Sequence, residues 1–146
     1  MKRMVSLLLA FVLCLSLSAC KSTGTINNVE VDYGSSVSFS DAEIESAFEA
    51  VIIIFKDFEG CDLRRLWYDE ERSNRIIQND ISTSGGNTIK NSGAAPENII
   101  ILFSDFYVAA IGADLGFSPD STYTDWNWIL IRDGKKDKWE VVGWGY

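Results

Sequence analysis

The clearest hydrophobic pattern in the chain predicts one long amphipathic helix. Apolar side chains recur there at three- and four-residue spacing, and they form a single stripe: Ile44, Phe48, Val51, Ile52, Phe55 and Phe58. Ile53 and Ile54 widen this stripe, so we expect the helix to be covered on more than one side. Ser40 with Glu43 three residues later makes a capping box at the start of this helix, and Gly60 suits the position after its end. We interpret the aromatic stripe as core and not as a cofactor-binding surface.

The residues that follow predict two strands and a short helix. Residues 61–68 are expected to be a first strand. Residues 69–80 are expected to form a short helix, in which Glu71 and Arg75 pair four residues apart. Residues 98–108 carry apolar side chains at both parities, which is typical of a central strand that is covered on both faces. Two stretches rich in glycine, serine and aspartate are expected to be loops: 82–97 and 109–124.

The C-terminal sequence DWNWILIRDGKKDKWEVVGWGY predicts a β-hairpin with its turn at 133–137. The simplest register opposes four pairs: Arg132 with Trp139, Leu130 with Val141, Trp128 with Gly143, and Trp126 with Gly145. In that register Trp126, Trp128 and Trp139 share one face of the sheet. Two interpretations stay open: these indoles line a pocket, or they pack on the helix, and the second is the more common use of tryptophan.

The first twenty residues predict an export signal with a lipid attachment site. Met1-Lys2-Arg3 is basic, and residues 4–19 carry no charge and are too few for a typical membrane-spanning helix. The run ends in Leu17-Ser18-Ala19-Cys20, which resembles the lipobox of bacterial lipoproteins. This resemblance implies cleavage after residue 19, a diacylglyceryl group on the thiol of Cys20, palmitate-type acyl chains, and a membrane anchor on the extracytoplasmic side. The alternative is an ordinary secretory signal in which Cys20 is incidental.

The expected organisation has three parts: residues 1–19 are a lipoprotein signal peptide, residues 20–39 are a flexible tether, and residues 40–146 are a single α+β domain. A short edge strand around Val29, Val31 and Tyr33 is an alternative within the tether. After removal of Lys2 and Arg3 the formal net charge would change from −8 to about −10. Such a charge argues against nucleic acid and anionic lipid headgroups as partners.

The composition narrows the chemistry further. The chain has no histidine, which excludes Ser-His-Asp and Cys-His catalysis and histidine-ligated zinc. With Cys20 lipidated, Cys61 would be the remaining thiol, and we expect it to be a small buried hydrophobe. We expect no cofactor and no metal.

A few acidic residues are candidates for special roles. Asp105 interrupts the central apolar strand, so it is a weak catalytic candidate, although strand twist could also expose it. The run Asp69-Glu70-Glu71 is expected to be a solvated first helical turn and not a metal cluster. Asp114, Asp120 and Asp125 lack the spacing of a calcium-binding loop.

These elements predict an α+β fold in which one long N-terminal helix packs on a curved antiparallel sheet of about four strands. The segments FEGCDLRRLWYDEE, NIIILFSDFYV and STYTDWNWILIRDGKKDKWEVVGWGY resemble small lipoproteins of Gram-positive, clostridium-like bacteria. Their domains of unknown function are similar to the cystatin and nuclear transport factor 2-like folds. The resemblance implies a concave sheet face with an aromatic-walled pocket, and it implies no catalytic residues.

Three functions are compatible with this sequence. The first is a lipid-anchored, non-catalytic domain that binds a small ligand, a peptide or a protein partner. The second is a carboxylate-dependent enzyme of isomerase or hydrolase type, with Asp105 in an aromatic-lined cavity. The third is an inhibitor or immunity-type protein whose acidity meets a basic partner.

Overall fold

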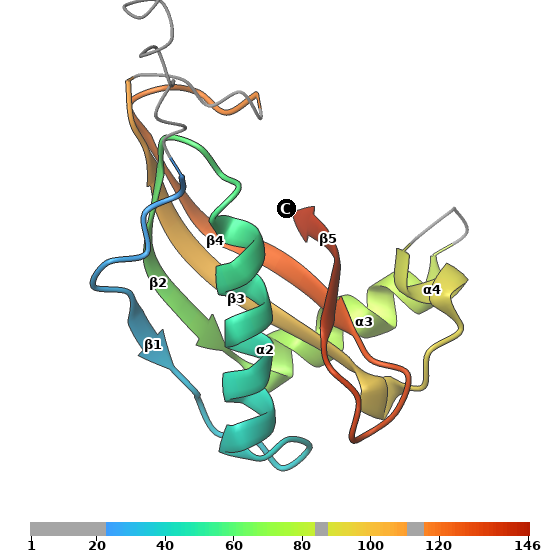
Figure 1. Cartoon of the computed structure of the whole chain (residues 1–146). Helices are drawn as coiled ribbons and strands as arrows, with labels where there is room; N and C mark the ends of the chain where they lie inside the picture. The colour runs from blue at the N-terminus through green and yellow to red at the C-terminus, as the bar shows by residue number, and fades with distance from the viewer. Residues whose placement is uncertain (1–22, 84–87, 111–115) are drawn as a thin grey trace, which may run out of the picture.

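A five-stranded sheet organises the fold in the computed structural model, which describes residues 23–83, 88–110 and 116–146 (Figure 1). Its strands follow one another in chain order: β1 (Glu30–Asp32), β2 (Cys61–Tyr68), β3 (Ile99–Val108), β4 (Ser121–Ile131) and β5 (Glu140–Gly145). β1 runs parallel to β2, whereas the other neighbours are antiparallel. The mixed α+β class is therefore confirmed, but the expected sheet of about four antiparallel strands is wrong in strand number and in the direction of its first edge.

Helices cover both faces of this sheet (Figure 1). The described helices are α2 (Asp41–Phe55), α3 (Glu70–Ser82), the short α4 (Thr88–Ser92), and a 3-10 turn at Pro96–Asn98. α2 lies on one face, and α3 and α4 lie on the other. The expectation of one long N-terminal helix is therefore wrong: α2 has 15 residues, and further helices follow it. α4 lies within the predicted loop 82–97 because Ile89 buries its side chain against the second face of the sheet.

The start of α2 is as predicted, but its end is not. The Ser40 hydroxyl accepts the N–H of Glu43, and the Glu43 carboxylate accepts the N–H of Ser40, which completes the capping box. The helix ends at Phe55, before Gly60, and a series of turns follows. Phe58 lies in those turns and is still 2% exposed, so the apolar stripe continues beyond the helix that was expected to carry it.

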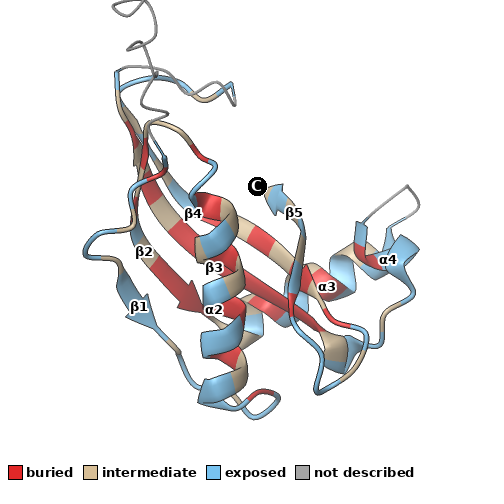
Figure 2. Ribbon diagram, in the orientation of Figure 1, coloured by how far each residue is buried: buried red, intermediate tan, exposed pale blue. Residues whose placement is uncertain are grey.

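Two hydrophobic clusters lie on opposite faces of the sheet, and Figure 2 shows that much of its central strands is buried. The α2-side cluster includes Ile100, Leu102 and Phe106 of β3, and the α3-side cluster includes Ile101 and Phe103. The prediction that residues 98–108 form a central strand covered on both faces is confirmed. One polar link lies inside the α2-side cluster: Trp128 donates its indole N–H to the hydroxyl of Ser104 over 2.8 Å.

The hairpin register is correct near the turn and wrong beyond it. Leu130 opposes Val141 as predicted. A β-bulge between Ile129 and Leu130 then shifts the pairing by one residue, so Trp128 opposes Trp144 and Asn127 opposes Gly145. The two indoles of β4 therefore do not cover glycines.

Residues 24–39 belong to the folded unit, in contrast to the flexible tether expected over residues 20–39. The N–H of Gly24 donates to the carbonyl of Lys56 over 2.9 Å, and Thr25 bridges Asp62 of β2. A Cβ at Gly24 would lie 2.1 Å from the carbonyl oxygen of Phe55, so this close approach requires glycine. Phe39, at the end of the segment, is 8% exposed.

Replacing Ser104 by alanine tests the polar link inside the core. Both partners are fully buried, so the Trp128 N–H would lose its acceptor with no water to replace it. We expect Ser104→Ala to lower the free energy of unfolding by about 1–3 kcal/mol, measured by urea denaturation. Ser46→Ala, at an exposed position on α2, is the matched control and should change it by less than about 0.5 kcal/mol. Equal values for the two variants would show that the link contributes nothing.

Candidate functional site

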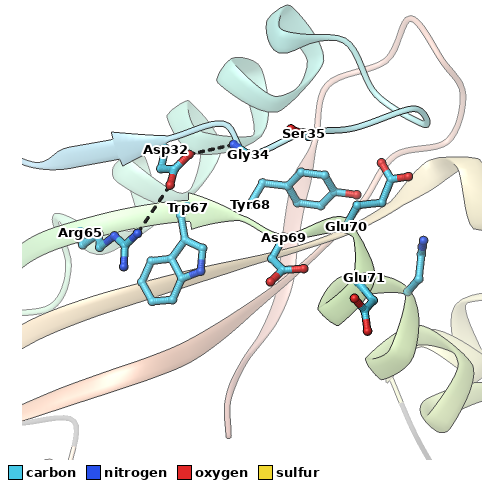
Figure 3. A pocket seen from close by; sticks show the side chains of 10 residues that line it. Asp32, Gly34, Ser35, Arg65, Trp67, Tyr68, Asp69, Glu70 and Glu71 are labelled. Carbon is cyan, nitrogen blue, oxygen red and sulfur yellow. Dashed lines mark hydrogen bonds and ion pairs between the residues drawn. The ribbon is translucent and has the colours of Figure 1, made fainter.

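An open cleft of about 650 Å³ lies between the end of β1 and the start of α3 (Figure 3). Its walls come from β1 and the following turn, from the end of β2, and from the first turns of α3: Asp32, Gly34, Ser35, Arg65, Trp67, Tyr68, Asp69, Glu70, Glu71 and Asn74. Most of these side chains are polar, and four are carboxylates. The site therefore offers hydrogen-bond acceptors and negative potential more than apolar area.

The parallel pairing of β1 and β2 creates this cleft. Asp32, the last residue of β1, pairs with Trp67 of β2, so both strands end at the same edge of the sheet. The chain then leaves in two directions: one segment turns at Gly34, and the other enters α3 through its N-cap Asp69. The Asp69 carboxylate accepts the N–H of Arg72 over 3.0 Å, which fixes the start of the helix.

Glu70 joins the two walls. Its carboxylate accepts the hydroxyl of Ser36, the N–H of Val37 over 3.0 Å, and the N–H and hydroxyl of Ser38 over 3.3 Å. Burial raises the pKa of this carboxyl, but these donors outweigh that effect and hold the pKa below its ordinary value. Glu70 is therefore a structural clamp on the segment after β1, and its position was missed because the acidic run at 69–71 was expected to be solvated.

Arg65, on the β2 side of the cleft, is the basic residue in its lining. The guanidinium of Arg65 lies 4.6 Å from the centre of the Trp67 ring, and its Nη2 lies 3.5 Å from the Asp32 carboxylate (Figure 3). The Asp32 carboxylate also accepts the N–H of Gly34 over 2.9 Å. Asp32, Arg65 and Trp67 gave no signal in the sequence, because only the pairing with a three-residue strand brings them together.

Tyr68 contributes a buried hydroxyl at the base of the cleft. The residue is 2% exposed, and its hydroxyl lies near Ser36 and Ser73 without a well-aligned hydrogen bond to either. Burial, and then the nearby Glu70 carboxylate, raise the pKa of Tyr68 to about 12. The phenol therefore stays protonated at neutral pH and keeps a hydrogen available to donate.

Asp105 lies outside the residues that line this cleft. It is half-buried on β3, opposite Arg65, and its carboxylate accepts the N–H of Asp125 over 2.9 Å. Asp125 has a φ of 57° and lies where the β3–β4 pairing shifts register, and its own carboxylate pairs with Arg72 over 2.6 Å. These contacts give Asp105 a structural role at the irregularity in β4.

The three tryptophans chosen as pocket candidates all join the α2-side cluster. Trp126, Trp128 and Trp139 are 9%, 0% and 5% exposed, so their rings pack in the core. Trp128 lies against Phe55 and Phe58, which corresponds to the packing interpretation. Trp139 also borders a shallow groove beside α2.

The remaining residues that the sequence singled out lie only partly within the described ranges. Cys61 is buried, and burial raises the pKa of its thiol to about 11, as expected for an inert core cysteine. Cys20, the expected signal peptide at residues 1–19, and Asp114 lie outside the described residues. Within residues 23–83, 88–110 and 116–146, no three histidine, cysteine or acidic side chains are grouped to hold a metal ion. In the same ranges no helix has the length and apolar character needed to cross a membrane.

Comparisons with protein families, with curated proteins and with solved structures found no match to this chain.

Glu70→Gln tests the clamp. The amide can replace only part of the carboxylate's acceptor capacity and its NH2 group faces other donors, so the segment after β1 should loosen. We expect the amides of Val37 and Ser38 to exchange hydrogen roughly ten-fold faster, which corresponds to the loss of about one hydrogen bond. The pKa of Tyr68 should also fall, because the Glu70 charge helps to raise it.

Glu71→Gln is the matched control for this experiment. Glu71 is the neighbouring acid, 86% exposed at its side chain, and its ion pair is with Arg75 on the surface of α3. It should leave both exchange and the Tyr68 titration unchanged. Equal responses of the two variants would mean that charge alone, and not the Glu70 contacts, holds the segment.

Proposed function

We propose that this chain is a lipid-anchored extracytoplasmic lipoprotein whose folded domain is a non-catalytic binding or interaction module. The observation that carries the proposal is the sequence Leu17-Ser18-Ala19-Cys20 after a basic start and an uncharged run. Two or three acyl chains on Cys20 would give stable anchoring, because each buried CH₂ contributes about 0.8 kcal/mol. A single acyl chain would give only reversible binding.

The position of Gly24 supports a specific orientation on the membrane. Gly24 contacts Lys56 beside the end of α2, and four residues beyond Cys20 can span at most about 14 Å. The cleft lies at the other end of β2, whose eight residues span roughly 26 Å. An anchor at Cys20 would therefore hold the α2 end of the domain near the bilayer and direct the cleft away from it.

The chemistry of the cleft favours a positively charged ligand. Asp32, Asp69, Glu70 and Glu71 face one cation, Arg65, so the local charge is negative. The protonated hydroxyl of Tyr68 adds a buried donor at the base. Amine- or guanidinium-bearing molecules fit this combination of charge and hydrogen-bonding groups.

We also propose that the domain is related in architecture to the cystatin and nuclear transport factor 2-like folds. The support is a helix, α2, that packs along one face of a sheet of long antiparallel strands. Two features depart from that expectation: β1 is parallel to its neighbour, and α3 with α4 covers the opposite face.

The anchor is tested by expression of the full chain in a bacterial host that matures lipoproteins. We expect the mature protein to begin at Cys20, to carry a diacylglyceryl group in the mass spectrum, and to partition into detergent. Cys20→Ser should shift the protein to the aqueous phase, because no acyl chain can be attached.

Cys14→Ser is the control, since this thiol lies inside the leader and would be removed with it. It should leave partitioning unchanged. An unmodified thiol at position 20, or a full-length chain in the cytosol, would refute the proposal.

A further inference from the structure

The last strand of the sheet, β5, has an open edge. It is the terminal strand in the sheet order, and no other strand of the described residues pairs with its outer side. Its residues alternate between exposed and intermediate burial along the whole strand (Figure 2). Natural edge strands are commonly protected by lysine, proline or a covering loop, because their unpaired N–H and C=O groups can pair with another chain. From Val141 to Tyr146 the edge has no charged residue and no proline.

An apolar groove runs beside this edge. It has a volume of about 340 Å³ and lies between α2 and β5, which stand side by side in Figure 1. Its lining consists of Ala50, Ile53, Ile54, Trp139, Glu140 and Val141. Ile53 on α2 is 64% exposed, and Trp144, further along β5, is 47% exposed. Both elements beside the groove therefore carry a large exposed apolar side chain. An added strand would pair with β5 and place alternate side chains in this groove.

The acidic residues of α2 and the first residue of β5 indicate the kind of partner. α2 carries four acidic residues and no basic one over its whole length. Glu45 and Glu49 are exposed on it, and Glu140 begins β5. The full chain has 21 acidic and 13 basic residues, so two copies repel each other at long range. A basic extended segment is therefore favoured over a second copy of the chain.

We propose that β5 and the groove beside α2 form a docking site for an extended, positively charged segment of a partner protein, which adds as a sixth strand of the sheet. Backbone hydrogen bonds to β5 supply the register. Apolar side chains at alternate positions enter the groove against Ile53, Ile54 and Val141. The proposal depends on the groove alone, and neither the lipid on Cys20 nor the cleft beside α3 is needed for it.

The test uses a fluorescent peptide of alternating valine and lysine, with the length of β5, and the full chain purified in mild detergent. Anisotropy should show saturable binding, and hydrogen exchange of the β5 amides should slow in the complex. The same peptide with N-methyl groups on alternate residues cannot pair with the edge, and it should bind at least about ten-fold more weakly. An alternating valine–glutamate peptide should also bind more weakly.

Two variants locate the site. Val142→Lys puts a charge on the open edge at a residue that is 41% exposed, and Ile53→Ser removes apolar area from the wall of the groove. Each should lower the affinity for the valine–lysine peptide by about ten-fold or more. Val37→Lys is the matched control: it adds the same charge at a 98% exposed residue that contacts Glu70 beside the cleft, and it should change the affinity less than about two-fold.

Three outcomes would overturn the proposal. One is no saturable binding of the valine–lysine peptide. Another is equal affinity of the N-methylated peptide, which would show non-specific charge attraction, or an equal effect of Val37→Lys, which would assign the peptide to the acidic cleft or to general charge attraction. The third is a concentration-dependent dimer in sedimentation equilibrium that Val142→Lys dissociates, which would assign the edge to a second copy of the chain.

Discussion

The guanidinium of Arg132 fixes the C-terminal hairpin against the rest of the fold. It is 5% exposed at the end of β4, and its Nη2 lies 2.9 Å from the Glu43 carboxylate at the start of α2. It also donates to the carbonyls of Glu97 and Lys135, and it lies 4.3 Å from the centre of the Trp139 ring. The indole of Trp139 in turn donates to the carbonyl of Glu43. This one buried charge joins α2, the turn before β3 and the hairpin, and its neutralisation by Glu43 is what makes its burial tolerable.

Glu43 stabilises both the start of α2 and the position of the C-terminal hairpin. One carboxylate oxygen completes the capping box with Ser40, and the other meets Arg132. The N–H of Ser40, and then its hydroxyl and Arg132, lower the pKa of Glu43 to about 2, although burial opposes them. Because the folded-state pKa lies below the unfolded value, this contribution to stability is complete above about pH 4.5 and declines as the pH falls toward 2. The hairpin thus keeps its place beside α2 at ordinary pH, and the groove between them persists.

The sequence correctly predicted the elements whose formation depends on residues close together in the chain. The strands predicted at 61–68 and 98–108 correspond to β2 and to β3, which begins at Ile99, and Glu71 pairs with Arg75 on α3 as predicted. These features depend on residues close together in the sequence, through the alternation of apolar side chains and through i,i+4 contacts. β1 could not be predicted as a parallel strand, since its three exposed residues gain their place only from β2. The cleft was missed for the same reason. The bulge in the hairpin was missed because tertiary packing of Trp144 against Phe58 and Trp128 competes with simple turn counting.

The most direct test of this account is native-state hydrogen exchange of Glu43→Gln. Glutamine at this position keeps the capping box but removes the charge that Arg132 meets. If the ion pair holds the hairpin in place, the β5 amides should lose protection by about ten-fold more than those of β2 and β3. An equal loss in all three strands, or no loss in β5, would contradict the claim that Arg132 and Glu43 position the open edge of the sheet.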